Sequence, residues 1–260
     1  MSEVFTFRAE FPERLKRFLH LLFGRDSHVL ALLIIGTPLS LLLGVAVGKY
    51  LLPLVQALVA FPLFLFLVAR QKWSRAFLAM ALWAFLGSVS VGIASYFWPA
   101  RMEATVLKGQ EYQGEMFHWI ETGVGPEGDI QQFLPQHLLH FGVFSLLTFL
   151  SAGFLGLVMG SVLVNYMSFY VGMLLLQAER FWAVLALGWP PWAVLRVLGF
   201  ILVAVFLAAL TIRLFTSVKL DLAGAKRCLA AGAVLLTLDV ILKWSLAPIW
   251  RSLLDAYTVL

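Results

Sequence analysis

The sequence predicts an all-α fold, a polytopic bundle of transmembrane helices, and three observations carry this prediction. Hydrophobic residues make up 62% of the chain and charged residues only 13%, whereas a soluble domain has about 45–50% apolar and about 25% charged residues. The apolar residues fall in runs of about 20, the length of helix that crosses ~30 Å of hydrocarbon. Basic residues gather at the ends of these runs, which is typical of membrane topology.

Seven spans are favoured over six. Their predicted ranges are 28–47, 50–69, 76–98, 137–163, 165–187, 193–212 and 228–247. The run 165–187 is interrupted by Gln177, Glu179 and Arg180, so a six-span bundle is the alternative. Six spans would place the basic loop 213–227 outside, against the tendency of Lys and Arg to remain in the cytoplasm.

The charge distribution also predicts the orientation. Most basic residues fall in segments that seven spans place inside: Arg8, Arg14, Lys16, Arg17, Arg25, Arg70, Lys72, Arg75, Arg213, Lys219, Lys226 and Arg227. Segment 99–135 instead holds two basic and six acidic residues, and we expect it to be an extracytoplasmic loop. The sequence therefore predicts a multi-pass protein of the cell (inner) membrane with a cytoplasmic N-terminus.

The chain is expected to have two parts. Residues 28–260 form a single transmembrane domain, and residues 1–27 form a cytoplasmic amphipathic helix. In the latter, Phe11, Leu15 and Phe18 share one helical face, while Arg14 and Arg17 lie elsewhere on the helix. This pattern is typical of a helix that lies in the headgroup layer, and docking of a partner is the alternative.

The densest group of potential metal ligands lies between residues 111 and 140. If 111–122 is helical, His118 and Glu121 share a face, and if Pro135 begins the next helix, His137 and His140 share another. Imidazoles with a carboxylate suit a divalent metal such as zinc, which would be the cofactor of such a site. Solubility at the membrane surface and a pH-sensitive histidine cluster are the alternatives.

A second group consists of charged residues predicted to lie at membrane depth, where a charge costs a few kcal/mol. The group comprises Glu179, Arg180, Arg196, Asp239 and Lys243. Asp239 and Lys243 are expected to pair along one helix, and Arg196 is expected at the depth of Glu179. Residues of this kind either hold helices together or line a path for a polar solute or proton.

No motif in the sequence specifies a reaction. HExxH, GxSxG and GxxxxGK[ST] are all missing, so the familiar hydrolase and ATPase routes have no support. The single cysteine excludes an intramolecular disulfide and a CxxC site. Expected partners are the lipid bilayer and other membrane proteins or a second copy of the chain, and not nucleic acid.

Three functional hypotheses remain. The first is a transporter or permease-type protein for a small polar solute or ion, which the intramembrane charges favour. The second is a membrane-embedded, metal-dependent enzyme with its site at the extracytoplasmic face. The third is a non-catalytic subunit of a membrane complex.

Overall fold

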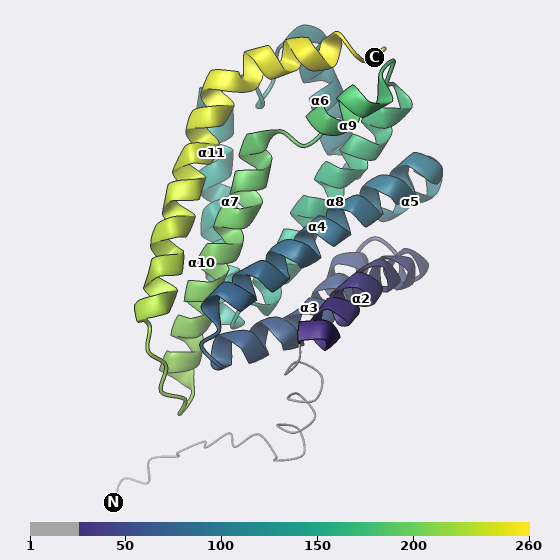
Figure 1. The fold of residues 1–260 in the computed structure, drawn as a ribbon. Coiled ribbons are helices and arrows are strands. Elements are labelled where there is room, and N and C mark those ends of the chain that lie inside the picture. Colours follow the sequence, from purple (N-terminus) through teal and green to yellow (C-terminus); the bar gives the residue numbers. More distant parts are fainter. Residues whose placement is uncertain (1–25) are drawn as a thin grey trace, which may run out of the picture.

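The computed structural model describes residues 26–260, and these form an all-α bundle (Figure 1). Seven of the described helices are long and apolar enough to cross a membrane. They are α2 (Asp26–Val47), α3 (Leu52–Ala69), α4 (Trp73–Phe97), α7 (Ile130–Leu150), α8 (Phe154–Leu176), α10 (Pro191–Phe215) and α11 (Ala223–Asp255). The predicted polytopic bundle with seven spans is therefore confirmed, while the predicted amphipathic helix at the N-terminus lies almost wholly outside the described residues.

Three shorter helices connect the long ones: α5 (Pro99–Thr105), α6 (Gly109–Thr122) and α9 (Phe181–Leu187). The predicted helix 111–122 thus exists as part of α6. No strand occurs between residues 26 and 260, where a single antiparallel bridge joins Ala178 to Thr258.

The predicted ranges of the fourth and fifth spans are wrong. The chain turns inside the predicted fourth span, at Ala152 and Gly153, which have φ of +50° and +102°. A side chain at Gly153 would also collide with Phe64, whose ring lies 2.4 Å from the position of an added Cβ. This turn interrupts an apolar run without a proline or charge, so hydropathy does not reveal it.

The start of the fourth span is also earlier than predicted. The Asp129 side chain accepts a hydrogen bond from the Gln131 backbone N–H at 2.8 Å and caps α7. Pro135, expected at the first helical position, lies inside this helix. A capping Asp satisfies N–H groups that have no partner within the helix, and this favours the earlier start.

Contacts between segments that are distant in the sequence identify the two ends of the bundle. At one end, the Asp221 N–H donates to Gln71 Oε1 at 3.3 Å, and we call this the basic end because it carries the loops 70–72 and 216–222. At the other end, the Glu179 N–H donates to the Tyr257 carbonyl at 2.9 Å. We call this second end, which contains α5, α6, α9 and the C-terminus, the acidic end (Figure 1).

Helix α10 occupies the middle of the second half of the bundle and packs against α4, α7 and α11. It approaches α11 closely at Gly199 and Gly232, where a Cβ on Gly232 would lie 3.0 Å from the Gly199 carbonyl oxygen. Small residues allow helix backbones to approach in this way. Many large apolar side chains of α2, α7 and α11 are exposed, and these surfaces contact lipid in a membrane protein.

The positions of the ends support a test of orientation. Reporter fusions after Gln110 and Leu260 should give extracytoplasmic signals, and a fusion after Lys219 a cytoplasmic one, because basic loops are retained inside. Paired reporters active on opposite sides of the membrane would measure this. A cytoplasmic signal from the Leu260 fusion would contradict the predicted orientation.

Candidate functional site

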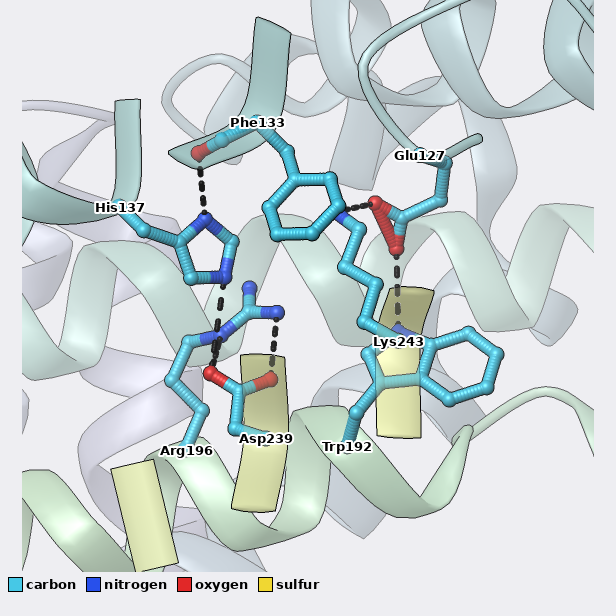
Figure 2. A network of polar contacts seen from close by, with 7 residues as sticks. All are labelled: Glu127, Phe133, His137, Trp192, Arg196, Asp239 and Lys243. Carbon is cyan, nitrogen blue, oxygen red and sulfur yellow. Dashed lines mark hydrogen bonds and ion pairs between the residues drawn. The ribbon is translucent and has the colours of Figure 1, made fainter. Parts of the chain in front are cut away.

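Polar side chains from four segments of the chain meet inside the bundle (Figure 2). The group comprises Glu127, His137, Trp192, Arg196, Asp239 and Lys243 together with the apolar ring of Phe133, and we call it the ion network. Glu127 belongs to the connection between α6 and α7, while the others come from α7, α10 and α11. Residues separated by more than a hundred positions in the sequence therefore form one site.

The first ion pair of the network joins α10 to α11. Arg196 donates through Nε to Asp239 Oδ2 at 2.9 Å and through Nη2 to Oδ1 at 3.0 Å. Asp239 is only 1% exposed. A paired, bidentate geometry of this kind is what makes a buried carboxylate tolerable. The close approach of the helices at Gly199 and Gly232 lies one turn from Arg196 on α10 and two turns from Asp239 on α11.

The second pair ties the α6–α7 connection to α11. Lys243, which is 2% exposed, donates from Nζ to Glu127 Oε2, and the Trp192 indole N–H donates to Oε1 at 3.3 Å. The ammonium also lies 4.5 Å from the centroid of the Phe133 ring, a cation–π distance. Burial alone would raise the pKa of Glu127, but the positive charges of Lys243 and Arg196 lower it overall.

These contacts correct the predicted pairings. Asp239 pairs with Arg196 rather than with Lys243, because Glu127 enters the bundle and takes the ammonium. Glu179 and Arg180 follow the fifth candidate span, which ends at Leu176. Both are exposed, and Arg180 lies over the Tyr257 ring with its Cζ 5.4 Å from the centroid.

His137 is oriented by its backbone and faces the first ion pair. Its Nδ1 lies 3.0 Å from the Phe133 carbonyl oxygen, and because a carbonyl only accepts, this nitrogen carries the proton. The other nitrogen, Nε2, is 3.5 Å from Asp239 Oδ2 and has no hydrogen-bond partner. In the neutral imidazole, Nε2 is therefore an available proton acceptor.

A cavity of about 440 Å³ lies beside the network, between α7, α8, α10 and α11. Its polar lining includes His137, His140, Tyr166, Arg196 and Asp239, and most of the remaining wall is apolar. We call it the charged cavity.

The lining of the charged cavity includes exposed apolar residues of α7 and α11. Both helices pack on α10, and the lining residues Leu138 of α7 and Ile241 of α11 are 62% and 48% exposed. Exposed apolar side chains at the middle of spanning helices face lipid. The wall of the charged cavity therefore includes apolar side chains at the surface of the bundle.

The four predicted metal ligands do not form one group. His118 and Glu121 are exposed on α6, whereas His137 and His140 line the charged cavity. Within residues 26–260, no group of three or more His, Cys, Asp or Glu side chains is arranged to hold a metal ion. A divalent metal cofactor such as zinc remains a prediction. Of the four predicted ligands, His137 and His140 line the same cavity.

Sequence reasoning identified Arg196, Asp239, Lys243 and His137 but missed Glu127 and Trp192. Glu127 looked like one of several acids in a loop. Its only distinguishing signal was its position between Gly125 and Gly128, where the chain is able to fold back.

Comparison with protein-family models, curated proteins and solved structures found no match to this chain. The fold and the apolar surface therefore define its class: it is a multi-pass α-helical membrane protein with a buried ion network.

The second ion pair is testable by removing one charge or both. Lys243→Met leaves the Glu127 carboxylate buried without its ammonium and should lower the free energy of unfolding by about 3–5 kcal/mol. The double change with Glu127→Gln should cost less, since no charge is left unpaired. Unfolding of the purified protein in detergent measures both.

The exposed pair Lys108–Glu111 provides the control, because its side chains are 62% and 64% exposed and 3.9 Å apart. Glu111→Gln should change stability by no more than about 0.5 kcal/mol. A double variant of the buried pair that is less stable than Lys243→Met alone would show that the pairing is wrong.

Proposed function

We propose that the protein is a membrane transport protein of the permease type and that its solute occupies the charged cavity. The observation that carries this proposal is a cavity of about 440 Å³ that reaches the buried Arg196–Asp239 pair. Ionisable residues inside a helical bundle commonly mark the path of a solute or ion. The seven helices that are long and apolar enough to cross a membrane also agree with a membrane transport protein.

The lining of the cavity refines the solute that the sequence suggested. A small ion or a wholly polar solute would need a polar wall, because each polar group buried without a partner costs free energy. The charged cavity is instead mostly apolar, with a few polar and charged residues. The solute that fits has an apolar body and one polar group.

A membrane-embedded enzyme is the second candidate, and His137 is the observation that favours it. Its Nδ1 is fixed by the Phe133 carbonyl, and its free Nε2 lies next to a carboxylate at the cavity. An imidazole oriented in this way is suited to general base catalysis. In the metal-dependent form of the hypothesis, His137 and His140 would hold zinc and supply it with neutral ligands.

The third hypothesis, a non-catalytic subunit, gives the charged cavity no role. The exposed apolar surfaces of α2, α7 and α11 suit lipid as well as a partner protein or a second copy of the chain. These surfaces therefore do not favour a subunit over a transporter.

Transport requires that the cavity be reached by water from both sides in turn. With Cys228 replaced by Ser, His140→Cys places a single thiol on the cavity wall. A membrane-impermeant thiol reagent should label this cysteine in right-side-out vesicles and, separately, in inside-out vesicles. Mass spectrometry of the labelled chain measures the extent.

Gly142→Cys on the same helix is the matched control, since Gly142 is exposed, lies outside the cavity lining and has open space around it. We expect it to react only with a lipid-soluble reagent. Labelling of His140→Cys from one side alone, or from neither, would contradict the transport proposal.

The metal-dependent enzyme makes a separate prediction. Protein purified without chelators should retain about one zinc per chain, the content of a mononuclear site, and His137→Ala with His140→Ala should abolish retention without unfolding the bundle. Elemental analysis and circular dichroism measure these quantities. His118→Ala, at an exposed position on α6, tests whether the original four-residue set is needed. Wild-type protein without stoichiometric metal would end this hypothesis.

A further inference from the structure

A second cavity lies on the other side of α8 and α10 from the ion network. It measures about 420 Å³ and is formed by α4, α8, α10 and the residue Trp189. We call it the apolar cavity. Its volume and that of the charged cavity both lie in the ~300–1,000 Å³ range of small-molecule pockets.

The two cavities share part of their walls. Met167 of α8 and Val197 of α10 line both of them. A third void of about 50 Å³ lies between them. It shares Ala84, Val164 and Val197 with the apolar cavity and Leu163, Val197 and Phe200 with the charged one. The separation is therefore a thin partition of apolar side chains. Met167 in that partition is unbranched and changes conformation at low cost.

The polar contents of the cavities differ sharply. In the apolar cavity, the hydroxyl oxygens of Ser88 and Ser168 are 2.7 Å apart and form a hydrogen bond with each other. Trp189 Nε1 is a buried donor without a partner. In the charged cavity, Asp239 uses two of the five N–H groups of Arg196. The remaining guanidinium donors are able to bind a further anionic oxygen.

From this arrangement we infer that the solute is a long-chain carboxylic acid that spans both cavities. Its carboxylate binds Arg196 beside His137, because a planar carboxylate matches the donor fork of a guanidinium. Its alkyl chain passes Met167 and ends in the apolar cavity, where no charged side chain lines the wall. The inference rests on the proposed function, since it assigns the solute of the same site.

Position-resolved photolabelling tests the inference on the full-length protein in lipid nanodiscs. Two hexadecanoic acid probes are used, one with a diazirine near the carboxyl group and one with it near the methyl end. The first should label α7 or α11 around the charged cavity. The second should label the inner face of α4 at Ser88 and Val89. The methyl ester of each probe should lose this labelling, because it lacks the anionic head.

Two variants of α4 separate cavity binding from labelling by bulk lipid. Val89→Trp fills the apolar cavity and should abolish labelling of α4 by the methyl-end probe while the carboxyl-end probe still labels α7 or α11. Ile93→Trp adds the same side chain to the same helix at a 52% exposed position outside the lining, and it should change neither pattern.

The outcomes distinguish the two proposals. Methyl-end labelling confined to α7 and α11 would overturn the inference and leave the charged cavity as the solute site. Carboxyl-end labelling next to Trp189 would overturn it as well, by reversing the orientation. If the acid and its methyl ester label both cavities equally, or label neither, the charged cavity is not the solute site. This result would contradict the proposed function as well as the inference. If Val89→Trp does not fold, the wild-type labelling map still decides between these results.

Discussion

The structure depends on keeping two carboxylates and two cations paired inside an apolar bundle. Arg196 with Asp239 and Lys243 with Glu127 form the two pairs. A buried pair adds little stability compared with a well-packed apolar alternative, yet loss of one partner leaves a charge that the interior does not solvate. The network therefore imposes positions: α10, α11 and the α6–α7 connection have to remain where their charges meet.

The α6–α7 connection is held by contacts on both sides of Glu127. Arg251 of α11 donates to the carbonyl oxygens of Trp119, Ile120 and Glu121 at distances of 2.6–3.1 Å. A cation at these carbonyls is favoured because the C-terminal end of a helix carries partial negative charge. Asp129 caps the start of α7. With both helix ends fixed, the short segment between them directs Glu127 toward Lys243.

The sequence was sufficient to predict the features that depend on composition. It did not predict the features that depend on which residues are neighbours in the folded structure. Apolar runs of spanning length and basic loops were enough for the number of spans. The turn at Ala152 and Gly153 was missed because the helices on both sides of it are similarly apolar. Arg196, Asp239 and Lys243 stood out as charges in apolar surroundings, but their partners did not, since the helical spacing of Asp239 and Lys243 suggested a local pair. The deciding partner, Glu127, comes from a loop that is distant in the sequence.

The charge balance of the ion network limits which solute the proposed site accepts. Glu127 and Asp239 offset Lys243 and Arg196, so the network is neutral while His137 is neutral. A proton on His137 Nε2 would face Asp239 Oδ2 at 3.5 Å, but that carboxylate already accepts two hydrogen bonds from Arg196. The site would then carry one positive charge beside the charged cavity. A carboxylate that meets a protonated His137 restores neutrality, and a carboxylic acid that gives its own proton to a neutral His137 leaves the site neutral, whereas a cation adds to the excess. The same arrangement that makes the buried charges tolerable is thus compatible with the carboxylate head group of the solute that we infer.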